Sequence, residues 1–324
     1  MIKKKTIIAA IATSALSLLA AAPPAVSQDV KSVELPGDQA YPESISAASD
    51  GTIYVSSLAS GGIFRIAPGS AKGEVWIKPG AFDSRSTLGV LVDEATKTLW
   101  VCSNDMSGMG VPGPGTVTGS YVKGFDLATG EGKFSAKLPG EHTLCNDMAI
   151  GPDGSLFVTN SLAPQILRLK PGSKELEVWL DDPQFEPPKG QPGVDGLAFG
   201  GDGNLYVNTF AKGDFFRVDV SNGTAGKVTK LKTSRPLSFP DALRPVSGQT
   251  FIMAEGGGTL DRVTVSGDEA TFETVKGGLS GPTAVALVGS TAWVAEGQLP
   301  HLFEAAKNGP PKLPFHVQSA QWTK

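Results

Sequence analysis

Cysteine and histidine are scarce in this sequence, which has two Cys and three His among 324 residues. Two cysteines are too few for a disulfide-stapled scaffold, and Cys102 and Cys145 form no CxxC metal or redox pair. No Ser-His-Asp arrangement and no phosphate-binding loop is readable. The chain therefore lacks the usual signatures of zinc sites, thiol redox enzymes and serine hydrolases.

Excess positive charge is also missing, since 28 Lys and Arg face 32 Asp and Glu. This balance argues against nucleic acid as a partner, because nucleic acid binding needs clustered basic residues. The 40 Gly and 24 Pro, about a fifth of the chain, exclude a coiled coil or helical bundle. Helical segments of the kind that separate the strands of a parallel β/α fold are absent as well. The composition, 40% hydrophobic and 19% charged, supports a packed core.

One long apolar run is present, over residues 7–22, and it follows the basic residues 3–5. The small residues 25–27 then offer a cleavage site before Gln28. The pattern predicts a signal peptide over residues 1–27 and a single domain over residues 28–324, exported to the periplasm or secreted. A retained membrane anchor is the alternative. No other stretch is apolar enough to span a bilayer, so we expect no membrane association after cleavage.

The chain repeats itself. Each of three segments has a short strand, an Asp-Gly turn and a second strand with an aromatic residue. Asp-Gly between two apolar runs is a strong hairpin signal, because the turn needs a positive φ. The three segments are residues 42–55, 145–158 and 194–207.

Looser copies fill the gaps between these segments, at residues 87–101, 241–252 and 282–294. Six four-stranded units at a spacing of about 45–50 residues, wider around the second copy, predict an all-β, six-bladed propeller with antiparallel blades. A two-sheet sandwich does not explain six similar units. To close the ring, residues 30–35 or 315–322 are expected to supply the outer strand of the last blade.

A ring of polar residues appears when the repeats are superimposed. Counting seven residues back from each turn Asp gives Glu43, Asn146 and Asp195. The equivalent positions in the looser copies are Leu88, Asp241 and Thr283. A shift of one residue in the alignment would give Pro240 in place of Asp241, or Pro282 in place of Thr283. The first strand of each blade lines the central tunnel, so these positions should converge. Three carboxylates would repel one another, and a hard cation would relieve this. Oxygen ligands point to a divalent metal, Ca²⁺ above all. Alternatively, these groups cap strand starts or bind tunnel water.

The chain resembles the senescence-marker-protein/gluconolactonase/luciferin-regenerating-enzyme family and the wider calcium-dependent lactonase and phosphotriesterase propellers. The resemblance covers roughly residues 40–305. The motifs that carry it are Pro42-Glu43-Ser44, Cys145-Asn146-Asp147, Val194-Asp195-Gly196 and Pro240-Asp241-Ala242.

The resemblance implies that Glu43, Asn146, Asp195 and Asp241 surround a catalytic divalent ion, with Asp241 as the general base. Asp195 departs from the family pattern, which usually has Asn there, and is a competing base. Leu144 stands where sugar-lactone members carry Arg, so a sugar lactone is not predicted. The expected reaction is hydrolysis of a small-molecule lactone or related ester. The alternative is a non-catalytic propeller that serves as a binding or scaffold module.

Several residues near the ring are further candidates for the site. The loop Ser103 to Ser120, the longest between second and third strands by sequence, contains Asn104 and Met106 and is interpreted as a substrate-binding lid; the alternative is a surface insertion. The segment Asp181 to Pro192 should enter the same face. His142 is either a proton shuttle or a solvated loop residue. Cys102 and Cys145 should lie on this face in adjacent blades, bonded as a disulfide or buried as separate thiols.

Overall fold

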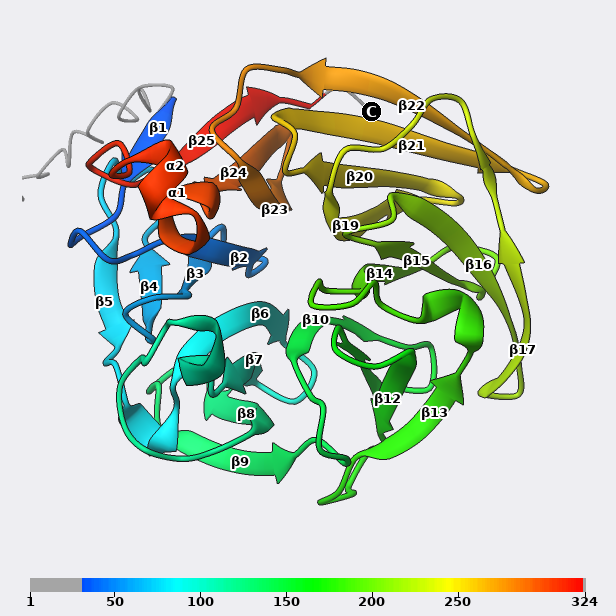
Figure 1. Ribbon diagram of the computed structural model, residues 1–324, viewed down its shortest axis with the longest axis horizontal. Coiled ribbons are helices and arrows are strands. Elements are labelled where there is room, and N and C mark those ends of the chain that lie inside the picture. The colour runs from blue at the N-terminus through cyan, green and yellow to red at the C-terminus, as the bar shows by residue number, and fades with distance from the viewer. Residues whose placement is uncertain (1–30, 323–324) are drawn as a thin grey trace, which may run out of the picture.

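The computed structural model describes residues 31–322. Six sheets are arranged around a central axis, which confirms the predicted six-bladed all-β propeller (Figure 1). The predicted signal peptide lies outside the described residues. None of the helices within residues 31–322 is long and apolar enough to cross a membrane.

Each blade takes its strands from nearly consecutive segments. Blades 1 and 2 comprise β2 (Pro42–Ala47), β3 (Ile53–Ser57), β4 (Ile63–Ile66) and β5 (Glu74–Ile77), then β6 (Ser86–Asp93), β7 (Thr98–Asn104), β8 (Ser120–Asp126) and β9 (Gly132–Lys137). Blades 3 and 4 comprise β10 (Cys145–Ile150), β11 (Leu156–Asn160), β12 (Gln165–Leu169) and β13 (Glu177–Asp181), then β14 (Val194–Phe199), β15 (Leu205–Thr209), β16 (Asp214–Ser221) and β17 (Thr224–Lys230). Blades 5 and 6 comprise β19 (Pro240–Ser247), β20 (Thr250–Glu255), β21 (Thr259–Ser266) and β22 (Glu269–Lys276), then β23 (Pro282–Val288), β24 (Thr291–Glu296), β25 (His316–Gln321) and β1 (Ser32–Glu34).

The strands of each blade run antiparallel from the tunnel outward. Blade 5 also carries β18 (Lys232–Thr233), a short fifth strand parallel to β22. Inner strands are buried and outer strands are largely exposed, as the contrast between β2 and β5 shows. The inner strands contact their neighbours all the way around the ring, so residues at equivalent inner positions face a common axis.

The ring closes in blade 6, where the two ends of the described chain meet. β1 pairs with β25, and the register joins Val33 to Val317. The sequence predicted that one of these two segments forms the outer strand. The structure uses both, with β25 as the third strand and β1 as the outermost.

The hydrophobic core lies between adjacent blades. Some second-strand aromatic residues pack across such an interface: Phe157 lies against Phe199 and Tyr206 against Phe251, with ring centroids 5.0 and 4.8 Å apart. The predicted Asp-Gly hairpins are also present, and Gly51 has the expected positive φ of 87°. The aromatic contacts and the turns therefore help to position these repeats in the ring.

Within residues 31–322, five short helices interrupt the loops: η1 (Ala81–Asp83), η2 (Ser107–Met109), η3 (Pro183–Phe185), α1 (Pro300–Phe303) and α2 (Ala305–Asn308). Helices α1 and α2 belong to the connection between β24 and β25. Leu299 and Leu302 pack against a core cluster that includes Tyr41 and Phe315. This connection therefore extends from blade 6 to the start of blade 1.

Candidate functional site

A β-bulge positions the polar ring. In every inner strand the register with the second strand shifts by one residue, for example between Pro42 and Ile45 in β2. The ring residue lies within this shift in all six blades. A bulge inserts one extra residue and bends the strand, which re-aims the side chain. The seven-residue spacing found in the sequence corresponds to this bulge.

The second strand satisfies the extra backbone amide at the bulge in three blades. The N–H of Ser44 donates to Ser56 Oγ at 2.8 Å, and that of Asp147 donates to Thr159 Oγ1 at 2.9 Å. Gly196 N–H donates to Asn208 Oδ1 at 3.2 Å. Because these buried amides have partners, the bulges are stable features of the fold.

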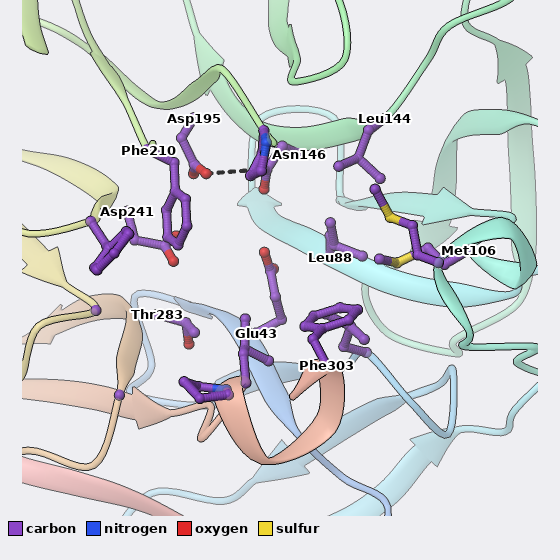
Figure 2. Close-up of a pocket in the computed structure, with 18 of the residues that line it drawn as sticks. Glu43, Leu88, Met106, Leu144, Asn146, Asp195, Phe210, Asp241, Thr283 and Phe303 are labelled. Carbon is purple, nitrogen blue, oxygen red and sulfur yellow. Dashed lines mark hydrogen bonds between the residues drawn. The ribbon is translucent and has the colours of Figure 1, made fainter. Parts of the chain in front are cut away.

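All six ring positions line one cavity of about 460 Å³ at the mouth of the tunnel: Glu43, Leu88, Asn146, Asp195, Asp241 and Thr283. The structure therefore brings together the residues that the repeat alignment picked out. In blade 5 Asp241 lines the cavity and Pro240 does not, whereas in blade 6 both Thr283 and Pro282 line it. Figure 2 shows their side chains surrounding a common space.

Asn146 and Asp195 are held in a fixed arrangement. Asn146 Nδ2 donates to Asp195 Oδ2 at 2.8 Å and to Ser161 Oγ at 2.9 Å (Figure 2). Both N–H groups are used, so the Asn146 carbonyl oxygen remains available to the cavity. Asp195 Oδ1 is buried and has no donor when its neighbours are ionised.

The three carboxyl groups of the ring have raised pKa values. Burial, followed by the charge of Asp147, raises the pKa of Asp195 to about 8. Burial and the nearby Asp195 charge raise the pKa of both Glu43 and Asp241 well above the ordinary range. Asp195 and Asp241 can hydrogen bond to each other when Asp241 carries a proton. The Arg244 charge works in the opposite direction and lowers the pKa of Glu43 and Asp195. The ring thus favours the binding of positive charge, either a proton or a cation.

The chemistry of the donor set fits a hard divalent cation. The ring offers three carboxylates and one amide carbonyl, and Asp195 Oδ1 is a buried oxygen without a partner. Among residues 31–322, no three His, Cys, Asp or Glu side chains stand close enough together to form a ready metal site. The ring is therefore a set of candidate ligands rather than a closed coordination shell.

Loops on the same face form the walls of the cavity. The predicted lid loop contributes Met106 and Met109, and the Pro-rich segment contributes Gly190 and Pro192. Arg85 anchors the lid loop, because its Nη1 donates to Val117 O at 3.0 Å and contacts Asp105 Oδ1 at 2.8 Å.

Cys102 and Cys145 form a disulfide, with Cα atoms 5.2 Å apart. It joins the second strand of blade 2 to the inner strand of blade 3. Of the two arrangements that the sequence left open, the structure has the bonded one. Cys145 directly precedes Asn146, so the disulfide also restrains one ring position.

Two predicted site residues lie elsewhere. Asn104 is buried and does not line the cavity. Its Nδ2 donates to the backbone oxygen of Cys145 at 2.8 Å, and the Cys145 N–H donates to Asn104 Oδ1 at 2.9 Å. It joins blade 2 to blade 3 and offers nothing to a substrate. His142 is exposed and is absent from the cavity wall. This placement favours the alternative reading of His142 as a solvated loop residue.

Sequence reasoning missed three aromatic residues and one loop that lines the cavity. Phe210, Phe239 and Phe303 line the cavity (Phe210 and Phe303 in Figure 2). Phe303 belongs to α1, in the connection over residues 297–315, which is longer than the Ser103 to Ser120 loop. The third strand of blade 6, β25, was not assigned from the sequence. Without its position, the length of the connection that precedes it cannot be determined.

Comparison with known proteins supports the resemblance found in the motifs. A family model described as strictosidine synthase-like, N-terminal, matches residues 28–66. No curated protein sequence matches the chain. The structural similarities below show that the chain shares its propeller fold with gluconolactonase and regucalcin structures, among others.

Solved propellers resemble the whole ring at low sequence identity. A gluconolactonase from Xanthomonas campestris has 15% identity and a TM-score of 0.61, with 88% of this chain and 87% of that chain covered. The calcium-binding protein regucalcin from Agrobacterium tumefaciens has 15% identity and a TM-score of 0.60, covering 89% and 93%. A virginiamycin B lyase from Staphylococcus aureus has 18% identity and a TM-score of 0.59, covering 89% and 83%. Identities this low establish a shared fold.

Proposed function

We propose that the protein is a hydrolase of a lactone or related ester that works with a divalent cation, Ca²⁺ being the best-matched ion. The observation that carries this proposal is the convergence of three carboxylates and one amide from four blades at the floor of a single cavity. The fold shared with a gluconolactonase and with the calcium-binding regucalcin supports the same class.

Glu43, Asn146, Asp195 and Asp241 would hold the ion through their side-chain oxygens. A bound divalent cation supplies Lewis acidity toward a carbonyl oxygen and neutralises the carboxylate ring. Asn146 has one available orientation, because Ser161 and Asp195 accept both of its N–H groups. The protein therefore presents a pre-oriented carbonyl oxygen together with the three carboxylates.

Asp241 would act as the general base, with Asp195 as its partner. The ionised base takes a proton from water while the water oxygen bonds to the acyl carbon. The acyl C–O bond then breaks, and the base returns the proton to the departing oxygen. A lactone gives a hydroxy acid, and an ester gives an acid and an alcohol. Asp195 can share the proton, because the two carboxyls are within hydrogen-bonding reach.

We also propose that the protein acts after export, in the periplasm or outside the cell. The Cys102–Cys145 disulfide supports this location, because such bonds persist in oxidising compartments. The basic and apolar character of residues 1–27 supports it from the sequence.

The direct test is a panel of lactones and aryl esters, assayed with added Ca²⁺ and with a chelator, alongside metal analysis of the purified protein. We expect hydrolysis that the chelator abolishes and Ca²⁺ restores. A protein that holds no metal and hydrolyses nothing would instead be a propeller used for binding or scaffolding.

A further inference from the structure

The cavity has a polar floor and apolar walls. Among the described residues that line it, the polar ones are Glu304 and the ring members Glu43, Asn146, Asp195, Asp241 and Thr283. The remaining lining residues are aliphatic, aromatic, proline or glycine. A ligand that fills this space therefore meets polar atoms at one end and apolar surface along most of its length.

The apolar walls come from several blades. Leu88, Met106 and Leu144 gather on one side, together with Phe303 from α1 (Figure 2). Phe210, from the loop after β15, lies on the opposite side of the cavity (Figure 2). Its ring centroid is 5.4 Å from that of Phe239. The space between the two sides leads to the ring carboxylates.

Charge restricts what can enter. Within the described chain, the residues that line the cavity include no Lys, Arg or His, and four of them are acidic. An anionic substrate would be repelled and would find no cationic side chain to pair with. A polyhydroxylated lactone would place its hydroxyls against Leu, Met and Phe, where unpaired polar groups are costly.

The backbone at Phe239 gives independent support. Three inner strands begin with proline, and the residue before each proline has positive φ: Tyr41 (36°), Phe239 (55°) and Gly281 (58°). Glycine adopts this conformation without strain, whereas bulky residues do not. Tyr41 is buried against Phe315, but Phe239 is 51% exposed at the cavity wall. A strained and exposed aromatic residue gains little from packing in the fold, which points to a ligand contact.

We infer that the substrate is an uncharged, lipophilic lactone or ester, with its carbonyl at the ring and its aliphatic or aromatic chain between Met106 and Leu144 on one side and Phe210 and Phe239 on the other. The claim that this ligand is hydrolysed rests on the proposed hydrolase function. The claim that the cavity prefers apolar ligands concerns binding alone and does not depend on hydrolysis.

The first experiment measures kcat/KM along a series of 4-nitrophenyl esters from acetyl to decanoyl, with γ-decalactone and glucono-δ-lactone compared in parallel. Each methylene that enters the walls should raise kcat/KM by up to about fourfold, until the cavity is full. γ-Decalactone should be hydrolysed at least tenfold more efficiently than glucono-δ-lactone. A preference for glucono-δ-lactone would overturn the inference and leave the hydrolase proposal intact.

The second experiment measures binding without turnover. The neutral fluorescent probe N-phenyl-1-naphthylamine should bind the intact protein, and γ-decalactone should displace it where glucono-δ-lactone does not. Probe binding with no hydrolysis of any ester would support the apolar site and count against the hydrolase proposal. Absence of probe binding, with no chain-length effect, would overturn the inference.

Phe239→Gly is the sharpest variant, because it removes the ring and relieves the positive φ, so folding should not suffer. We expect at least a fivefold loss of probe affinity and a flatter chain-length series, with no drop in Tm. Lys97→Gly is the matched control: Lys97 also has positive φ (52°) but is exposed in the turn between β6 and β7, away from the cavity. Equal effects of the two variants on probe affinity would overturn the inference.

Discussion

The Arg244 guanidinium of β19 donates two hydrogen bonds to the Asp147 carboxylate of β10, at 2.6 and 2.9 Å. Both side chains are largely buried, and blade 4 lies between their strands. Gly196, the counterpart of Asp147 in blade 4, has no side chain, and a Cβ there would lie 2.2 Å from Asp241 O. The pair therefore links blade 3 to blade 5 and keeps one positive charge beside the ring carboxylates.

Removing Arg244 should destabilise the protein strongly. Arg244→Met leaves the Asp147 carboxylate buried and unpaired, and breaking such a pair costs roughly 3–5 kcal/mol. Chemical denaturation measures the loss. The double variant Arg244→Met/Asp147→Asn should recover much of it, because Asn keeps the acceptor that Met148 N–H uses at 2.9 Å. Equal stabilities of the single and double variants would contradict this account.

The metal-free protein should lose stability as pH rises from about 6 to about 8. In the folded state the pKa of Asp195 is about 8, and those of Glu43 and Asp241 are also raised, so the folded state binds more protons than the unfolded state in this window. This contribution to stability is fully present only below the unfolded carboxyl pKa, near 4, and it falls steadily as pH rises through 6 toward the folded pKa of Asp195.

Thermal unfolding with a chelator and with added Ca²⁺ tests this pH dependence. The increase in Tm caused by Ca²⁺ should be greater at pH 8 than at pH 6, because the ion binds the ionised ring. Asp195→Asn should flatten the pH dependence of the chelated protein. A Tm that rises with pH in the chelated protein would refute the raised pKa values.

Substitutions at Asp241 and Asp195 should separate the two candidate bases. Asp241→Asn should lower kcat by about a hundredfold or more, since it removes the base and keeps the shape. Asp195→Asn should retain hydrolysis, because Asn keeps a side-chain oxygen at this position and Asp241 remains as the base. The readout is the initial rate at saturating Ca²⁺, with circular dichroism as the control for folding. A fully active Asp241→Asn variant would remove Asp241 from the mechanism.

Loss of the disulfide should reduce stability without changing the fold. The bond between Cys102 and Cys145 closes a loop with a sequence separation of 43 residues. The chain-entropy model gives about 4 kcal/mol for a loop of this length, and native disulfides commonly contribute 2–5 kcal/mol. The Cys102→Ala/Cys145→Ala variant, compared with the oxidised protein in guanidinium, measures the difference. A variant that unfolds at the same midpoint would argue against this contribution.

The ring was predictable because the sequence repeats preserve a fixed count between the turn and the bulge. Asp50, Asp153 and Asp202 each precede a glycine with positive φ, and the residue seven positions earlier lies in the bulge in each case. Because the backbone geometry recurs in each blade, residues at the same distance from the turn in sequence occupy equivalent positions around the tunnel. The bulge itself leaves no signal in one sequence.

The walls of the cavity were less predictable, because they come from loops that do not repeat. The direction of the Asn104 side chain depends on the backbone of Cys145 in the next blade, which the sequence does not place. Phe303 depends on where the third strand of blade 6 begins. Phe239 looks like any residue before a proline until its φ is known.

Closure of the ring through β1 and β25 also sets the order of assembly. β25 lies between β24 and β1, so blade 6 cannot be completed until the chain has been synthesised through Gln321. The segment over residues 299–304, which forms part of the cavity, lies in the connection that leads directly into β25. The ribosome must therefore have synthesised the chain through Gln321 before the ring can close, and a nascent chain released earlier would lack a closed ring.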